Sequence, residues 1–311
     1  MGLCPVALNN RSVMLLLVLA SVMAAIRADC DACVEGRCYT RKTLARELYI
    51  PDQMAIDRKN SILYVHTDSE MNTAFFHEDL TIQLVRRQNF SGLTVDQDTQ
   101  ILYTGDSKNV HKYSQDNTNI STKLSFSNQD KYYLPNLLFY KDCLMYTEKS
   151  NTGLYSIIKD EVRQYNSLKK YKISDFVVQV GCDPAKVYFV ANDTTYTYNG
   201  DKIVTNVLAT KSFVLSADKY NNVYFGDATV NVIYKMDNET NQLLEYAAYE
   251  SGSVDKFVFD NNNNIVFYDS SDGSFSLWKP DLFDSAACTI EAPHSKYRIN
   301  KSVLEQNGFI R

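Results

Sequence analysis

The chain has 311 residues, a formal net charge of −5 at pH 7 and a hydrophobic content of 45%. A mildly acidic surface argues against nucleic acids and anionic membranes as partners. Tyrosine is abundant, with 22 residues against a single tryptophan, which suits an all-β chain whose aromatic side chains lie on sheet faces.

The first 28 residues have the pattern of a secretory signal peptide. Arg11 precedes an apolar run, residues 13–26, that ends in small residues, and cleavage is expected near Ala28. A membrane anchor is the alternative, but the run is short for a bilayer span. We therefore predict a signal peptide at residues 1–28 and a secreted, extracellular mature chain.

A unit of short strands and polar turns recurs along the rest of the chain. In residues 93–113, apolar runs at 93–96, 101–103 and 110–113 are separated by Asp- and Gly-containing turns. An aromatic residue marks the second strand of six such units, at intervals of about 40 residues, which is the period of a propeller blade. These residues are Tyr64, Tyr103, Tyr146, Tyr188, Tyr224 and Phe267.

The recurrence predicts an all-β, six-bladed β-propeller with four-stranded blades over residues 29–285. We expect residues 43–51, which precede the first unit, to supply the strand that completes the last blade. Residues 286–311 do not repeat, and we expect them to form a C-terminal tail on or beside the propeller.

The cysteines predict a propeller stapled by disulfides. After loss of Cys4 with the signal peptide six remain, and an even number in a secreted chain implies three bonds. A zinc site is the alternative, but no histidine lies near the first three thiols. We expect Cys143 to pair with Cys182 from the next unit, and Cys288 to pair with one of the N-terminal cysteines. The six cysteines are Cys30, Cys33, Cys38, Cys143, Cys182 and Cys288.

Five sequons in the mature chain predict a glycoprotein, because each falls in a stretch with turn or strand-edge character. They begin at Asn89, Asn119, Asn192, Asn238 and Asn300.

The sequence has none of the familiar catalytic signatures, such as G-x-S-x-G, H-E-x-x-H or a phosphate loop. We therefore predict no catalytic residue, no metal ligand and no cofactor. A calcium site is the alternative, in which the acids that close the second strands converge on one mouth of the channel and bind the ion. Their regular recurrence favours turn capping instead. These acids are Asp68, Asp106, Glu148, Asp193, Asp227 and Asp269.

The mouth of the channel is the candidate binding site. Inner strands begin, and second strands end, on the same face of a propeller, where loops are free to vary. The mixture of aromatic, amide and charged side chains there would suit a planar, partly polar small molecule held by stacking and hydrogen bonds. The predicted ligand-binding residues are Gln53, His66, Asp106, Asn136, Glu148, Phe176, Phe213, Asp227, Lys256 and Asp269.

Three features together resemble the insect ommochrome-binding proteins: the signal peptide, the cysteine-rich start CDACVEGRCY at residues 30–39, and repeats of the form LYVHTD and LYTGD. Those proteins are secreted into haemolymph and bind tryptophan-derived phenoxazinone pigments. The resemblance implies a monomeric carrier of a small aromatic ligand, without catalysis. It carries no ligand-contacting residue over to this chain.

Two other functions remain open for such a propeller. One is a calcium-dependent lactonase or esterase of the regucalcin or paraoxonase kind. The other is an extracellular protein-interaction module that uses a whole face of the ring.

Overall fold

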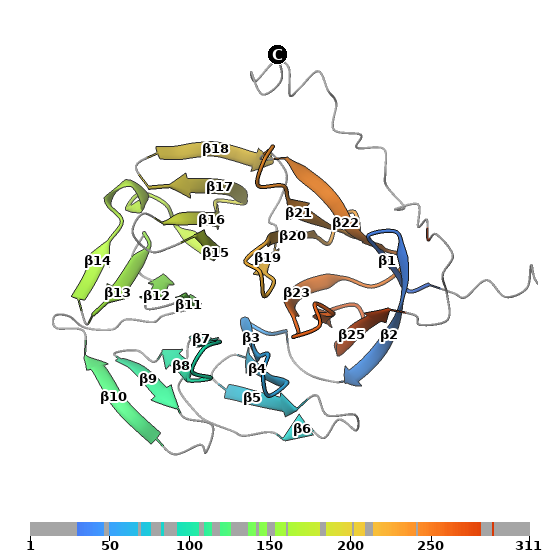
Figure 1. Ribbon diagram of the computed structural model, residues 1–311, viewed down its shortest axis with the longest axis horizontal. Coiled ribbons are helices and arrows are strands. Elements are labelled where there is room, and N and C mark those ends of the chain that lie inside the picture. The colour runs from blue at the N-terminus through green and yellow to red at the C-terminus, as the bar shows by residue number, and fades with distance from the viewer. Residues whose placement is uncertain are drawn as a thin grey trace, which may run out of the picture.

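The computed structural model describes residues 30–46, 50–67, 70–75, 82–83, 92–105, 109–113, 119–125, 136–140, 143–147, 153–159, 161–180, 185–200, 202–208, 214–240, 242–280 and 288. These residues form antiparallel sheets arranged as a ring, with one 3-10 turn, η1 (Asn166–Leu168) (Figure 1). The predicted all-β class is confirmed.

Four sheets of the described chain have four strands each, paired in sequence order. Their strands are β3 (Gln53–Asp57), β4 (Ile62–Thr67), β5 (Glu70–Phe75) and β6 (Ile82–Gln83); β7 (Gly92–Val95), β8 (Leu102–Gly105), β9 (Asn109–Tyr113) and β10 (Asn119–Ser125); β11 (Asn136–Tyr140), β12 (Cys143–Thr147), β13 (Tyr155–Ile158) and β14 (Glu161–Gln164); β15 (Ile173–Val180), β16 (Lys186–Ala191), β17 (Thr194–Asn199) and β18 (Lys202–Leu208).

A fifth sheet has nine strands, where the sequence predicts separate sheets of four. Its strands, in spatial order, are β19 (Val214–Ala217), β20 (Val223–Asp227), β21 (Val232–Met236), β22 (Leu243–Tyr249), β1 (Ala32–Val34), β2 (Arg37–Ala45), β25 (Ser274–Pro280), β24 (Ile265–Asp269) and β23 (Val254–Phe259).

The strands nearest the centre of the ring are β3, β7, β11, β15, β19 and β23 (Figure 1). Each contacts the next in that order, and β23 contacts β3, so the inner strands enclose a central channel. Each inner strand is the edge strand of its sheet. This is the arrangement of a β-propeller.

Local turn chemistry explains why the inner strands stop where they do. Asp218 Oδ1 accepts hydrogen bonds from the N–H groups of Tyr220 and Asn222 at 2.8 and 2.9 Å. Asp260 Oδ1 accepts the equivalent bonds from Asn262 and Asn264, both at 2.8 Å. Such Asx turns replace the ladder with a local bond and end the strand. The recurring acids at the ends of inner strands are therefore turn caps.

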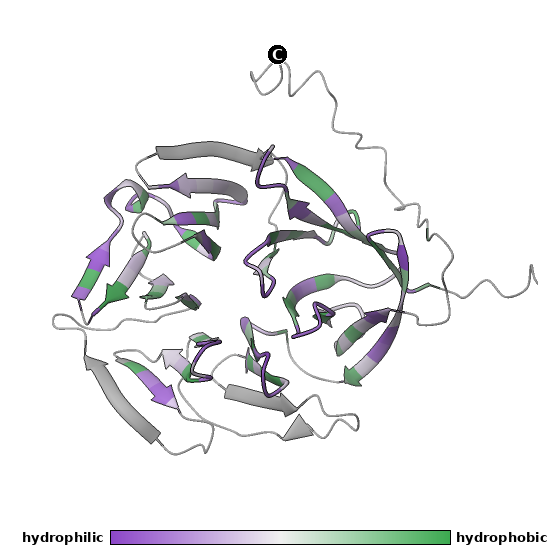
Figure 2. Ribbon diagram, in the orientation of Figure 1, coloured by the Kyte–Doolittle hydropathy of each residue, from purple (hydrophilic) through white to green (hydrophobic). Residues whose placement is uncertain are grey.

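The core lies between neighbouring sheets. In one cluster, Val177 and Tyr188 of one sheet pack against Leu215 and Phe225 of the next, and all four are buried. Figure 2 shows hydrophobic residues along the strands and hydrophilic ones at many of the turns. A single sheet buries its faces only against its neighbours, which is why one unit of the repeat is not a domain by itself.

The ring is closed by the N-terminal hairpin. Strand β2 pairs with β25, placing Arg41 opposite Trp278, and β1 pairs with β22, so the hairpin joins the two parts of the nine-stranded sheet. The predicted closing segment, residues 43–51, is wrong in position, since it overlaps β2 only at residues 43–45. A tight turn with positive φ at Glu35 and Gly36 reverses the chain directly after the first cysteines, so the closing strand begins there.

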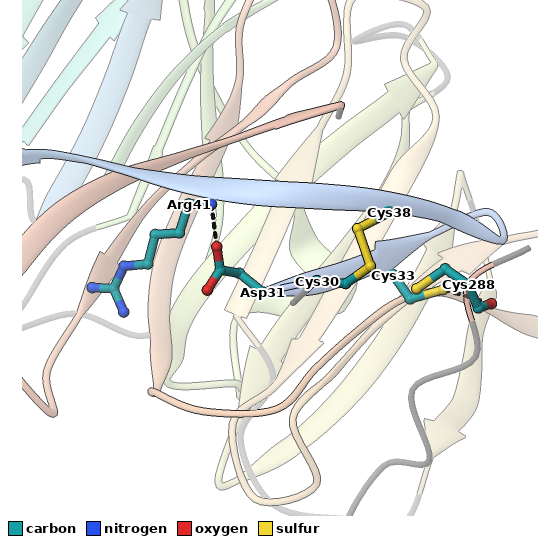
Figure 3. The surroundings of a disulfide bond; sticks show 6 residues. All are labelled: Cys30, Asp31, Cys33, Cys38, Arg41 and Cys288. Carbon is teal, nitrogen blue, oxygen red and sulfur yellow. Dashed lines mark hydrogen bonds between the residues drawn. A yellow bond between two sulfur atoms is a disulfide. The ribbon is translucent and has the colours of Figure 1, made fainter. Parts of the chain in front are cut away.

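The disulfides agree in part with the predicted framework. Cys30 and Cys38 are bonded, a pair that the sequence does not single out (Figure 3). Cys143 is also disulfide-bonded, to a partner outside the described residues, so its pairing with Cys182 stays a prediction. The predicted disulfide between Cys288 and an N-terminal cysteine is not formed in the structure, because Cys30 pairs with Cys38 and no disulfide joins Cys33 to Cys288. Cys288 nevertheless lies against the N-terminal hairpin: its N–H donates to Gly36 O at 3.0 Å, and the Cys33 thiol donates to Cys288 O at 2.9 Å.

The predicted signal peptide and almost all of the predicted tail lie outside the described residues. Within the described ranges, no helix is long and apolar enough to cross a membrane. Of the predicted glycosylation sites, Asn192 and Asn238 are exposed at turns. Asn89 and Asn300 lie outside the description, and Asn119 starts β10, where only the backbone is described.

Candidate functional site

Side chains that cross the channel form hydrogen bonds with backbone N–H and C=O groups on the free edges of the inner strands. An edge strand carries N–H and C=O groups without a ladder partner, and buried groups of this kind need other partners. We call the end of the channel where inner strands begin the upper mouth, with Gln53, Asn136, Asp175 and Lys256. The end with Arg58 and the turns that follow the inner strands is the lower mouth.

At the upper mouth, Gln53 links three inner strands. Its Oε1 accepts from Leu93 N–H of β7 at 2.9 Å, and its Nε2 donates to Leu137 O of β11 at 2.6 Å. Asn136 continues the chain of bonds, because its Nδ2 donates to Ser174 O of β15 at 2.8 Å. Both side chains therefore join inner strands to one another at the upper mouth.

Asp175 connects the other half of the upper mouth. Its Oδ2 accepts from Leu215 N–H of β19 at 3.3 Å, and its Oδ1 accepts from Phe176 N–H at 2.9 Å. The Lys256 ammonium on β23 lies 3.7 Å from Asp175 Oδ2. The two charged side chains are about a quarter exposed, at 25% for Lys256 and 20% for Asp175, so they meet at the border between channel and solvent.

Arg58 crosses the lower mouth. Its Nε donates to Phe259 O of β23 at 3.1 Å and its Nη2 to Ala217 O of β19 at 2.9 Å. Burial lowers the pKa of Arg58, and the nearby carboxylates of Asp218 and Asp260 oppose that shift. The guanidinium thus ties β3 to two inner strands across the ring.

Between the mouths lies a cavity of about 190 Å³, lined by residues of all six inner strands. Its wall includes Ala55, Thr94, Leu138, Val177 and Ser216. The cavity is therefore lined by short polar and aliphatic groups together with aromatic residues, among them Phe139 and Tyr140.

Phe176 does not supply the stacking surface that the sequence predicts. It lines the cavity, but the residue is only 5% exposed and belongs to a core cluster between sheets. The ring of Phe257 is also packed against a neighbouring strand. It lies so close to Gly226 that a Cβ atom at that glycine would be 2.9 Å from the ring. The rings of Phe176 and Phe257 are therefore used in packing. Of the predicted site residues, the polar Gln53 and Lys256 are the ones that remain available to a ligand in the channel.

The predicted site residues divide into three groups. Gln53, Phe176 and Lys256 line the cavity, and Asn136 stands beside it at the start of β11. His66, Asp227 and Asp269 are described but do not line the cavity. Asp106, Glu148 and Phe213 lie outside the described residues.

His66 is fully buried on the second strand of its sheet, opposite Gln53 in register. Its Nδ1 lies 3.4 Å from Asp52 Oδ2, and its carbonyl accepts from Asp52 N–H at 2.8 Å. The imidazole is held under the rim by these contacts.

Asp227 and Asp269 cap turns, as the regular recurrence of these acids suggests. Asp227 Oδ1 accepts from Thr229 N–H at 2.9 Å and from Thr229 Oγ1 at 2.6 Å. Asp269 Oδ1 accepts from the N–H groups of Ser253 and Ser271 at 2.8 and 2.9 Å. Burial works to raise the pKa of Asp269, but hydrogen bonds from Ser271 and Ser253 and the charge of Arg41 outweigh it, so this pKa is lowered overall.

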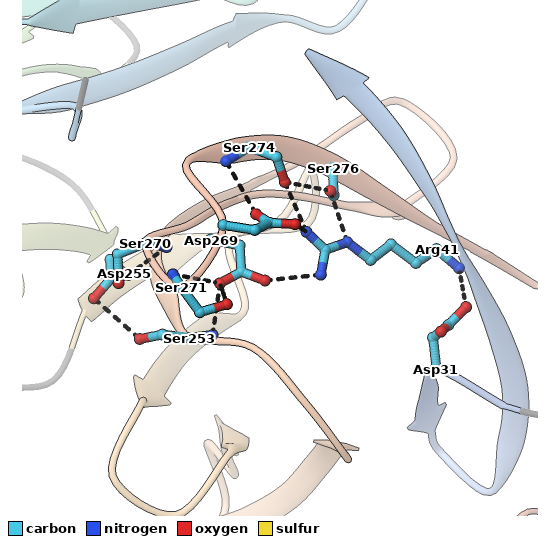
Figure 4. Close-up of polar contacts among 10 residues, drawn as sticks. Asp31, Arg41, Ser253, Asp255, Asp269, Ser270, Ser271, Ser274 and Ser276 are labelled. Atoms are coloured by element: carbon cyan, nitrogen blue, oxygen red, sulfur yellow. Dashed lines mark hydrogen bonds and ion pairs between the residues drawn. The ribbon is translucent and has the colours of Figure 1, made fainter. Parts of the chain in front are cut away.

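Arg41 organises the turn that Asp269 begins (Figure 4). Its guanidinium donates to Asp269 Oδ2 at 2.8 Å, to Asp272 Oδ2 at 2.9 Å, and to the hydroxyls of Ser274 and Ser276 at 2.7 and 2.8 Å. The arginine comes from β2 and its partners from the other end of the chain, so no local pattern in the sequence could have revealed the cluster.

Sequence reasoning also missed Asp175, which lies one residue before the predicted Phe176. A β-bulge at Ser174 shifts the register of β15 by one residue, so the acid lies toward the channel and the phenylalanine toward the core. The sequence did contain a signal for Asp175. Like Gln53 and Asn136, it is a polar residue near the start of an inner strand, and an alignment of the repeats on these polar residues would have identified it.

Within the described part of the chain, no group of three or more His, Cys, Asp or Glu side chains is arranged to hold a metal ion.

Comparison with known proteins supports the fold class. No family model and no curated protein matches the sequence. Among solved structures, a gluconolactonase from Xanthomonas campestris has a TM-score of 0.61 at 11% identity, covering 82% of this chain and 96% of its own. An auxiliary nutrient binding protein from Bacteroides ovatus has a TM-score of 0.57 at 11% identity, covering 79% and 77%.

The WD40 β-propeller domain of Doa1 has a TM-score of 0.53 at 10% identity and covers 78% of this chain and 98% of its own. At such low identities the likeness concerns the fold alone. The chain is a β-propeller.

Proposed function

We propose that this propeller binds a small organic molecule at the upper mouth of its channel and acts as a secreted carrier. One observation carries the proposal: a cavity bounded by all six inner strands has Gln53, Asp175 and Lys256 at one mouth. Concave sites with a few convergent polar groups are the usual form of small-molecule sites.

We further propose that the ring has six blades of four strands. The nine-stranded sheet then consists of β19–β22 and of β23–β25 with β2, bridged by β1. The continuous contacts from β3 round to β23 and back support this count.

Secretion is supported by the bond between Cys30 and Cys38 and by the disulfide at Cys143, because disulfides persist in oxidising compartments. The proposed ligand class is an ommochrome-type pigment, on the strength of the family resemblance. The polar residues of the wall, such as Gln53, Thr94 and Ser216, support hydrogen bonding to such a molecule.

The test is an absorption spectrum of the protein purified from its natural source and passed through gel filtration. A carrier of the proposed kind retains a visible band at a fixed ratio to protein. A colourless protein that also fails to bind added xanthommatin in equilibrium dialysis would rule out pigment carriage.

A lactonase is the second candidate, favoured by the gluconolactonase among the structural neighbours. The test is hydrolysis of glucono-1,5-lactone followed with a pH indicator, in calcium chloride and in EDTA. Hydrolysis above the spontaneous rate that EDTA abolishes would establish a calcium hydrolase. Hydrolysis at the spontaneous rate under both conditions supports the carrier.

A further inference from the structure

Two of the inner strands are interrupted by a β-bulge at the upper mouth. In β15, Ile173 pairs with Ala191 and Asp175 with the very next residue, Val190, so Ser174 is the extra residue. In β23, Val254 pairs with Asp269 and Lys256 with Tyr268, so Asp255 is the extra residue. The described pairing of the other four inner strands with their neighbours is unbroken.

Both bulges precede the residue that carries a charge into the channel. A bulge re-aims the side chains that follow it, and bulges are concentrated beside functional sites. Here one precedes Asp175 and the other precedes Lys256. The two side chains then meet across the mouth, with β19 lying between their strands.

The Asp175 carboxylate has more polar contacts than the Lys256 ammonium. The Asp175 carboxylate accepts from Leu215 N–H and Phe176 N–H as well as facing Lys256. An ammonium group has three donors. Among the residues that the structure describes, the Lys256 ammonium faces Asp175 Oδ2 at 3.7 Å, which is beyond the distance of a good hydrogen bond.

Other carboxylates near this mouth already have partners. Asp255 accepts from Ser253 Oγ and from Ser270 N–H, and Asp269 faces Arg41. The Lys256 ammonium therefore has donor capacity at a partly buried position that lines the cavity.

We propose that Lys256 binds the negatively charged group of a small organic anion, with Asp175 orienting the ammonium toward the cavity. This inference rests on the proposed small-molecule function and deepens it, because it names the charge of the ligand. Charge-assisted hydrogen bonds are shorter and stronger than neutral ones, so the anionic group is the part of the ligand that is recognised most strongly.

The test uses two fluorescent probes with the same rings. The anion 8-anilinonaphthalene-1-sulfonate and the uncharged N-phenyl-1-naphthylamine are titrated into the folded protein, into Lys256→Gln, and into Lys279→Gln as a control. Lys279 is exposed on β25, so its substitution changes net charge equally without touching the channel. Lys256→Arg keeps the positive charge. The signal of the single Trp278 confirms that each variant is folded.

Lys256→Gln is expected to raise the Kd of the anion by about tenfold or more while shifting the neutral probe less than about twofold. Lys279→Gln leaves both unchanged, and Lys256→Arg retains the preference for the anion. The inference is overturned if Lys256→Gln binds the anion as tightly as the unmodified protein does, or if it loses affinity for both probes equally. In either case the proposed site still stands, provided that the unmodified protein binds the neutral probe. Failure of both probes to bind the unmodified protein overturns the inference together with the proposed function.

Discussion

The guanidinium of Arg41 lies 2.8 Å from the carboxylate of Asp269, a contact that joins residues 228 positions apart. The Asp269 side chain is fully buried and that of Arg41 is 19% exposed. Because β2 is the strand that closes the ring, this ion pair fixes the two ends of the propeller to each other.

Arg41→Met is expected to lower the free energy of unfolding by about 2–3 kcal/mol, since it leaves a buried carboxylate without its cation. Denaturant unfolding followed by Trp278 fluorescence measures the loss, because Trp278 lies opposite Arg41 on the neighbouring strand. Arg37→Met, at an exposed position of the same strand, is the control and should change stability little. Equal stability of the two variants would contradict the structural role of the pair.

Asp269 should also make stability depend on acid pH. Its pKa in the folded protein is lowered from 3.8, so its contribution is fully present above that value and is lost as the pH falls through the folded pKa. The stability difference between the unmodified protein and Asp269→Asn is therefore expected to be constant from pH 6 down to about pH 4 and to shrink as the pH falls below 3.8. A difference that does not shrink below pH 3.8, measured by urea unfolding, would show that the charge of Asp269 is not responsible.

Gln53→Ala should destabilise the ring by about 1–3 kcal/mol, because Leu93 N–H and Leu137 O lose their partner at the free edges of two strands. Gln242→Ala, at an exposed position, provides the matched control. Thermal unfolding of both variants is the measurement. A change no larger than that of the control would mean that water replaces the amide at no cost.

Gly252→Ala should be more damaging than Gly36→Ala, although both glycines have positive φ, +98° and +76°. A Cβ at Gly36 meets nothing within 4 Å, so that variant measures backbone strain alone, about 1–2 kcal/mol. A Cβ at Gly252 would press on the Asp269 carboxylate, which has to shift. Chemical denaturation of the pair tests this ranking, and equal losses would refute the clash.

Cys33 and Cys288 are expected to form a disulfide when the protein folds in an oxidising compartment, because the thiol of one already contacts the carbonyl of the other (Figure 3). Mass spectrometry after non-reducing digestion with trypsin and an Asp-specific protease separates Cys30, Cys33 and Cys38 and identifies the linked peptides. Cys288→Ser should then leave Cys33 open to alkylation. A chain in which Cys33 is alkylated without that substitution would exclude the bond.

What the sequence by itself determined is the local part of the structure. The repeating units, their strands and their turn-capping acids follow from short-range chemistry, in which Asp218 or Asp260 binds backbone groups two to four residues away. Such interactions need no partner from elsewhere in the chain, so a single sequence reveals them.

The tertiary structure alone decided which side chains meet. The bulges before Asp175 and Lys256 exist only relative to a partner strand, and a one-residue shift exchanges the channel face for the core face, as it does for Phe176. Arg41 and Arg58 find their partners across the ring closure and across the channel. These contacts depend on segments about 160 to 230 residues apart in sequence being brought together, which no local spacing encodes.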